Sequence, residues 1–355
     1  MKRLLAISSL LCLFAAMQVK AQGSGSPQEQ GKLQEATLKD VVNTLGKRIS
    51  LHGYLQMGYT YEDDEDSNPN TFEIKRAILI AKGKITDRWT LNFMFNLSGT
   101  SKVLDCYTEY RLAPWLYIRA GQFKPNFTIE CPLSACDMEL IKRYSMATNY
   151  FCGVDGSDPL WGSNTGRDLG LMLRGELMKG LLTYSLAVMN GQGINQKDKN
   201  DQKDIVGNLT LKPLNELTLS GSFMTGRGCA VATSDINPDI AVGQNYERHR
   251  WACGFFLKTQ AIDLRSEYIG GKDGHVKADG CYAVTSVHLP RKVDLIAGVD
   301  YLNKSKSLSD KQTDYTIGLQ YWFYPSCRLQ AQYTYCDSHL DGGHNLVQAQ
   351  IQVRF

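Results

Sequence analysis

The end of the chain, residues 344–355, alternates between polar and apolar side chains and finishes on an aromatic residue. One face carries Val347, Ala349, Ile351, Val353 and Phe355, and the other carries Leu346, Gln348, Gln350, Gln352 and Arg354. Side chains of a β-strand point alternately to its two sides, so this pattern predicts a strand between an apolar and an aqueous environment. A closed barrel in a membrane provides those two environments, with lipid outside and water inside.

The same alternation recurs along the chain from Ile49 onward, in predicted strands with no helical period between them. It is clearest in 89–97, 169–177, 315–323 and 327–335. Soluble β-sandwiches also alternate, but they rarely expose so many leucines and aromatic residues on so many long strands. The repetition therefore favours a membrane barrel.

The connections between these strands alternate in length. Short ones fall near 86–88, 113–115, 178–180, 212–216, 260–263, 290–292 and 325–326. Longer polar ones span 62–70, 98–102, 129–166, 190–203, 226–247, 270–275, 303–312 and 337–343. Short turns at one end and longer loops at the other are typical of outer-membrane barrels. Seven turns and eight loops join about sixteen strands, so residues 49–355 are predicted to form an all-β, antiparallel transmembrane barrel wide enough for an aqueous channel.

The connection 129–166 is much longer than the others and is rich in cysteine, tyrosine, tryptophan and aliphatic residues. Loops of this length without strand pattern are usually functional or disordered. Its apolar content predicts that it packs, and the lumen is the expected place. An external flap is the alternative that the sequence leaves open.

The N-terminal residues indicate export. Residues 1–21 combine a basic start, an apolar stretch and a small-residue site before Gln22, as in a cleaved signal peptide. Residues 22–48 are predicted to be a periplasmic leader with one short helix. Lys2, Arg3 and Lys20 leave with the signal peptide, so the 39 basic residues fall to 36 against 36 acidic ones. This balance provides no field for attracting nucleic acid, and no nucleic-acid partner is expected.

Two stretches resemble a known family. Residues 119–130 (RAGQFKPNFTIE) are similar to the passage from strand to long loop in the phosphate-selective porin O/P family, and 166–173 (GRDLGLML) are similar to the strand that follows. Residues 72–77 and 209–226 add weaker similarity. The resemblance implies a sixteen-stranded porin of the bacterial outer membrane, a homotrimer with the long loop folded inward.

The expected function is passive diffusion of small hydrophilic solutes, with anions such as phosphate among the candidates. Lumen-facing charges of both signs are predicted along the wall, so the sequence leaves the ion preference open. Outer-membrane lipid and lipopolysaccharide are the expected surroundings. The alternative is a non-conducting barrel with an adhesive or structural role and a plugged lumen.

Selective pores place rings of charge at their constriction, and the basic residues around the long loop are the candidates. They are Arg111, Arg119, Lys124, Lys142, Arg143, Arg167, Arg174 and Arg328. The competing interpretation is that these residues pair with Glu130, Asp168 and Glu176 and hold the loop in place. The six histidines are scattered outside any nucleophile motif, so no catalytic residue, metal site or cofactor is predicted.

Two further features of the sequence each have two interpretations. The acidic run 62–66 is either a solvated loop or a site for divalent cations that bridge lipopolysaccharide. Cys131, Cys136 and Cys152 share the long loop, where they form either a disulfide or free thiols.

Overall fold

The computed structural model describes residues 46–63, 70–100, 103–142, 144–154, 158–162, 165–340 and 342–355. The predicted signal peptide, nearly all of the predicted leader and most of the acidic run 62–66 lie outside these ranges. Among the described residues, every helix is too short or too polar to cross a membrane.

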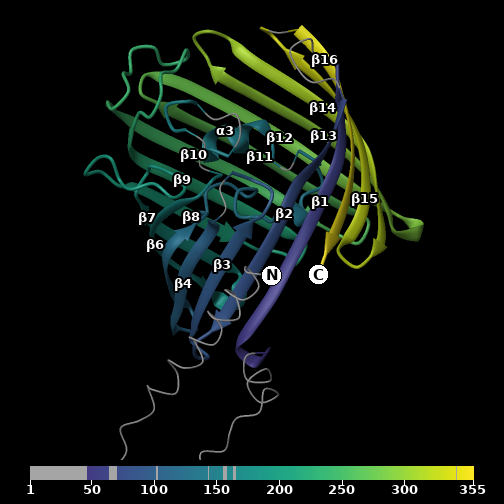
Figure 1. Cartoon of the computed structure of the whole chain (residues 1–355), viewed down its shortest axis with the longest axis horizontal. Coiled ribbons are helices and arrows are strands. Elements are labelled where there is room, and N and C mark those ends of the chain that lie inside the picture. The colour runs from purple at the N-terminus through teal and green to yellow at the C-terminus, as the bar shows by residue number, and fades with distance from the viewer. Residues whose placement is uncertain are drawn as a thin grey trace, which may run out of the picture. The chain divides into compact units, whose positions relative to one another are not determined.

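Sixteen antiparallel strands of the described chain form one closed barrel, in which each strand pairs with its neighbours in sequence and β1 pairs with β16 (Figure 1). They are β1 (Ile49–Glu62), β2 (Asn70–Lys84), β3 (Trp89–Asn96), β4 (Val103–Ala113), β5 (Leu116–Phe123), β6 (Asp168–Leu177), β7 (Leu182–Met189), β8 (Asp204–Leu211), β9 (Leu217–Cys229), β10 (Asn245–Lys258), β11 (Ile262–Asp273), β12 (Val276–Leu289), β13 (Val293–Ser305), β14 (Asp310–Tyr324), β15 (Cys327–Ser338) and β16 (Gly342–Arg354). The predicted fold class is confirmed.

The two faces of the wall follow the period of two that the sequence displays. On β15, Leu329, Tyr333 and Tyr335 are exposed on the outer face, whereas Gln330 and Gln332 are buried on the inner face. Outer residues are open because lipid, not protein, is their natural neighbour. The wall therefore has an apolar exterior and a polar interior.

At one end of the barrel the connections between strands are short. The 3-10 turns η2 (Met178–Gly180) and η3 (Pro290–Lys292) are two of them. Lys179 and Lys292 adopt positive φ angles of 58° and 63° there. At the other end the connections are longer on average, although only 274–275 separate β11 from β12. The predicted loop 270–275 was therefore too long, since the strands continue further than the alternation indicated.

A bulge interrupts the pairing of β2 with β1, and the sequence alone does not show it. Gln56 pairs with Arg76 and Met57 pairs with Ile74, so Lys75 is an extra residue on β2. One extra residue reverses the side to which the following side chains point. Lys82 therefore faces the interior, together with Ile78 and Ile80.

The connection between β5 and β6, residues 124–167, will be called the inner segment. Its described part contains the 3-10 helix η1 (Ala135–Asp137) and the helix α3 (Met146–Cys152). The side chain of Ser145 accepts a hydrogen bond from the Thr148 N–H at the start of α3, and Gly153 ends the helix in the left-handed conformation.

The helix α3 contacts β11, β12 and β13, and Figure 1 shows it among these strands. It approaches them at two glycines of the inner face. A Cβ atom on Gly280 would lie 2.8 Å from the Ala147 Cβ, and one on Gly271 would lie 2.9 Å from the Phe151 ring. The inner segment therefore packs against the inside of the wall, and its apolar residues form the main buried core with side chains from β5 to β13.

Candidate functional site

Lys142 holds the inner segment to β13 and β14. Its Nζ lies 2.9 Å from an Asp300 carboxylate oxygen and 2.7 Å from one of Asp314. Burial opposes the charge, but the two carboxylates raise the pKa of Lys142 above its ordinary value, so it is an ammonium ion. The Ile141 N–H donates to Gln332 at 2.8 Å and extends this contact to β15.

A second polar contact joins the segment to β11. The Arg265 guanidinium lies 2.5 Å from Glu139 and 3.3 Å from Glu130, and both carboxylates belong to the inner segment. Burial raises the pKa of the Glu130 carboxyl, while Arg265 acts against that shift. Arg328 of β15 donates to the Met138 carbonyl at 2.5 Å and lies over the Trp322 ring at 5.0 Å. These contacts fill the side of the lumen formed by β11 to β15.

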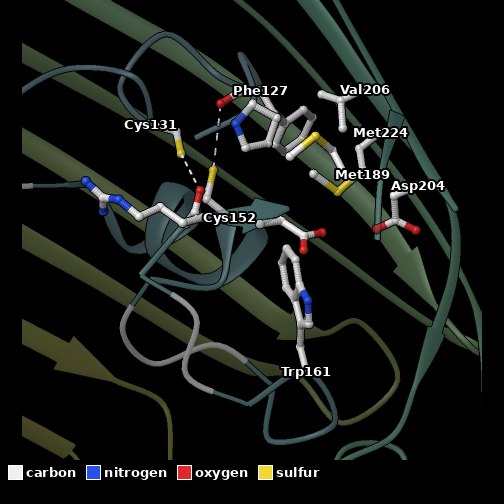
Figure 2. Close-up of a pocket in the computed structure, with 12 residues that line it drawn as sticks. Phe127, Cys131, Cys152, Trp161, Met189, Asp204, Val206 and Met224 are labelled. Carbon is white, nitrogen blue, oxygen red and sulfur yellow. Dashed lines mark hydrogen bonds between the residues drawn. The ribbon is translucent and has the colours of Figure 1, made fainter. Parts of the chain in front are cut away.

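Apolar side chains fill the side formed by β7 to β9. Figure 2 shows Phe127, Cys152 and Trp161 of the inner segment beside Met189, Val206 and Met224, which come from β7, β8 and β9. The space left among them is only about 10 Å³, too little for a passage. Arg248 and Arg250 of β10 continue the packing, with their guanidinium carbons 4.2 Å and 4.4 Å from the Trp161 ring centre.

Three cysteines of the inner segment are buried, and all are free thiols in the structure. Burial raises the pKa of Cys136 to about 11 and that of Cys152 well above its ordinary value. Figure 2 shows the thiol of Cys152 directed at the Phe127 carbonyl, 3.8 Å away.

We expect Cys136 and Cys152 to resist alkylation in the folded barrel. At pH 8 a rise in pKa from 9.0 to about 11 lowers the thiolate fraction about a hundredfold, and the thiolate is the reactive form. Timed iodoacetamide labelling with peptide mass spectrometry measures the rates, and the urea-unfolded chain is the control. Equal rates in both samples would contradict the packing of the inner segment.

An open cavity of about 390 Å³ lies on the remaining side, between the inner segment and strands β1 to β6. It is lined by Tyr54, Ile80, Lys82, Asn92, Met94, Asp105, Tyr107, Arg119, Phe123, Lys124, Asn126, Pro132, Leu133, Ser134, Arg167 and Arg174. Five of these residues are basic and one is acidic. We call this space the basic cavity.

Glu109 of β4 binds two arginines of the basic cavity. One of its oxygens lies 2.9 Å from Arg119 Nε and 2.8 Å from Arg174 Nε, and the other lies 2.6 Å from an Arg174 terminal nitrogen. Arg119 also lies over the Tyr107 ring at 4.2 Å. The arginines are therefore fixed in position by one shared carboxylate and an aromatic ring.

Two other basic residues of the cavity, Arg167 and Lys124, are also held in place. Arg167 donates from Nε to Asp105 at 2.6 Å. Lys124 donates to the Cys131 carbonyl at 2.8 Å and contacts the Tyr144 hydroxyl. These contacts orient the side chains toward the space between the segment and the wall.

Of the eight basic residues singled out in the sequence, four meet at the basic cavity. They are Arg119, Lys124, Arg167 and Arg174. Lys142 and Arg328 lie on the opposite side and hold the inner segment, and Arg111 is exposed near the short turns. Arg143 lies outside the described residues.

Among the described residues, the predicted acidic partners of Arg119, Lys142, Arg167 and Arg174 were wrong. Their partners are Glu109, Asp300, Asp314 and Asp105, whereas Glu130 pairs with Arg265. Asp300 and Asp314 reach Lys142 only when distant strands assemble. Sequence reasoning also missed Lys82, whose phase the bulge on β2 conceals.

No group of three or more histidine, cysteine, aspartate or glutamate residues is placed to bind a metal ion in the part of the chain that the structure describes. The site is therefore a set of charged and aromatic side chains around an open space.

The model of the family "Phosphate-selective porin O and P" matches residues 49–221. No curated protein sequence matches the chain.

Several solved structures share the fold. The anion-selective porin from Comamonas acidovorans superposes with a TM-score of 0.64 at 12% identity, covering 86% of this chain and 99% of that one. The trimer form of OmpT, an outer-membrane protein of Vibrio cholerae, superposes with a TM-score of 0.62 at 13% sequence identity, covering 86% of this chain and 99% of that one. The outer-membrane channel DcaP of Acinetobacter baumannii superposes with a TM-score of 0.59 at 11% sequence identity, covering 86% of this chain and 97% of that one. At these identities the likeness concerns the fold.

Proposed function

Because the chain belongs to the phosphate-selective porin O and P family, we propose that it is a porin of the bacterial outer membrane that lets small hydrophilic solutes diffuse through its lumen. The basic cavity is the observation that carries this proposal. It is an open space of about 390 Å³ along the described lumen lining, whereas the inner segment packs against the sides formed by β7 to β9 and β11 to β15. Passive diffusion requires no catalytic residue, and we assign none.

The charges of the basic cavity support small anions as the preferred solutes. Lys82, Arg119, Lys124, Arg167 and Arg174 provide five positive charges, and Asp105 and Glu109 provide two negative ones, so the difference is three positive charges. Basic rings favour anions in selective pores. The similar porin from Comamonas acidovorans is described as anion-selective, which agrees with this preference.

The second candidate function is a non-conducting barrel that serves adhesion or structure. The extensive packing of the inner segment against β7 to β15 favours it, because the segment occupies much of the space inside these strands. The two functions differ in one measurable property, which is the conductance of the folded barrel.

We expect the refolded protein to produce discrete open steps in a planar lipid bilayer. Potassium chloride at 1 M provides the current, and heat-dependent migration on a gel verifies that the barrel is folded before insertion. A folded barrel that stays silent over many insertions would exclude the channel and leave the adhesive or structural role.

We infer a homotrimer as the assembly. An apolar groove of about 590 Å³ crosses the outer face of β1, β2, β15 and β16, and Phe72 beside it is 85% exposed. Exposed apolar grooves of this kind suit contact with another copy, and the related OmpT structure is of a trimer form. Closure of the conductance in three equal steps is the expected sign in the recordings described above.

We further propose that residues 1–21 are removed as a signal peptide and that 22–48 lie on the periplasmic side. Both termini of the barrel support this, because Ile49 and Arg354 lie at the end closed by the short turns. The outward leucine and aromatic side chains would then contact outer-membrane lipid and lipopolysaccharide.

A further inference from the structure

A second charged and aromatic site lies on the outer face of the barrel, away from the lumen. It is a shallow groove of about 280 Å³ across β10 to β13, near the end that carries the longer loops. Trp251, Tyr268, Gly270, Lys272, Lys277 and Lys306 line it. We call it the outer groove.

The outer groove contains two lysines that face each other without an acidic partner. Lys272 of β11 pairs directly with Lys277 of β12 in the register of the sheet. Like charges directly opposite on neighbouring strands destabilise a sheet. Neither ammonium group forms an ion pair within the described residues.

Asp279, which also lines the outer groove, and Glu247 beside it contact residues other than Lys272 and Lys277. Asp279 lies 2.8 Å from the Lys306 ammonium and accepts a hydrogen bond from the Tyr268 hydroxyl at 2.5 Å. Glu247 contacts Arg227 at 3.6 Å and His249 at 3.7 Å. The charges of Lys272 and Lys277 are therefore left for a ligand from outside the chain.

Below the lysines, toward the middle of the membrane, lie two neighbouring aromatic rings whose planes are tilted by 50°. The Trp251 and Tyr268 rings lie 5.2 Å apart and are 46% and 39% exposed. The Trp251 ring extends over Gly270, where a Cβ atom would lie 2.9 Å from it. The missing side chain allows the indole to lie across β11. Such rings mark the level of the membrane interface in outer-membrane barrels.

We propose that the outer groove binds a phosphorylated, multiply acylated lipid of the outer leaflet. The Lys272 and Lys277 ammonium groups contact its phosphate, and the aromatic rings support its sugar and the first part of its acyl chains. The vertical order of positive charge above aromatic surface matches the order of headgroup above hydrocarbon in a lipid, which favours a lipid over a protein partner. The proposal depends on the outer-membrane location given above and is independent of conduction.

Native mass spectrometry of the full folded chain in detergent tests the proposal, with monophosphoryl lipid A as the probe. We expect one lipid bound per chain, and about tenfold weaker binding in the double variant Lys272→Gln/Lys277→Gln, since each lysine near an anionic surface strengthens attachment. The variant Lys212→Gln/Lys258→Gln, which removes two positive charges from the short-turn end, is the matched control and should bind as the natural chain does.

Three results would overturn the proposal. They are equal binding of fully dephosphorylated lipid A, unchanged binding by the Lys272→Gln/Lys277→Gln variant, and displacement of the lipid by millimolar inorganic phosphate alone. Thermal unfolding of the single variant Lys277→Gln keeps the test independent of the double variant. Without lipid this change should stabilise the barrel slightly by relieving repulsion, and with monophosphoryl lipid A the natural chain should gain more stability than the variant. A gain of equal size in both would also contradict the site.

Discussion

Replacing Glu109 by glutamine is expected to increase the preference of the channel for anions about three- to tenfold. Glu109 neutralises part of the charge of Arg119 and Arg174, whose nitrogens lie 2.6 to 2.9 Å from its carboxylate oxygens. With a neutral amide of the same shape in its place, the positive charges of both guanidinium groups are no longer partly neutralised. Their attraction for anions in the basic cavity is then stronger. Over a few ångströms in a partly hydrated site, one unit charge changes ion energies by about 1 kcal/mol or more.

The reversal potential under a gradient of potassium chloride measures this change. Glu176→Gln is the matched control, because Glu176 is an exposed carboxylate near the short turns and lies outside the basic cavity. The opposite exchange, Arg119→Gln with Arg174→Gln, should shift the preference toward cations. An unchanged reversal potential in both would mean that ions do not pass through the basic cavity.

Replacing Lys142 by methionine is expected to loosen the inner segment and destabilise the barrel by about 3–5 kcal/mol. The change leaves the buried carboxylates of Asp300 and Asp314 without their cation, and uncompensated buried charge has costs of about this size. Single-channel conductance should rise, because the segment is released from β13 and β14. Urea unfolding in detergent, followed by tryptophan fluorescence, measures the stability.

Two comparisons separate this explanation from a general effect of losing a lysine. Lys84→Met removes an exposed ion pair with Asp87 and should leave stability nearly unchanged. The triple variant Lys142→Met/Asp300→Asn/Asp314→Asn should recover much of the stability, because it removes the stranded charges as well. Recovery of stability with conductance still raised is the expected pattern. A Lys142→Met protein as stable as the natural chain would show that the contact does not hold the segment.

The barrel could be predicted from the sequence because the signals for its strands and turns come from residues close together in the chain. Alternation with a period of two, as in 327–335, reports a strand with one apolar face, and the short connections report the turns. Both signals depend only on neighbours in the chain. The connection 270–275 was placed too broadly because glycine and lysine near a strand end carry little information about where pairing stops.

The basic cavity could be predicted only in part, because its geometry depends on register. Glu109 faces Arg119 across one hairpin, but a shift in pairing between Arg111 and Ala113 hides that register in the sequence. Arg174 reaches the same carboxylate because Tyr117 pairs with Arg174 after the long inner segment, and the sequence does not specify this pairing. The partners of Lys142 could not be predicted from the sequence, because Asp300 and Asp314 lie more than 150 residues further along the chain.

The attachment of the inner segment to the inner face of the wall has a consequence for how such a protein can change. The strands are joined to each other by main-chain hydrogen bonds around the full circumference, so the cylinder does not depend on its contents for closure. Substitutions on the inner segment or on the strands that face it can therefore change the width of the lumen while the circumference of the barrel stays constant. Proteins with this fold can therefore change their solute preference through residues inside the barrel, while the outer face that contacts lipid stays the same.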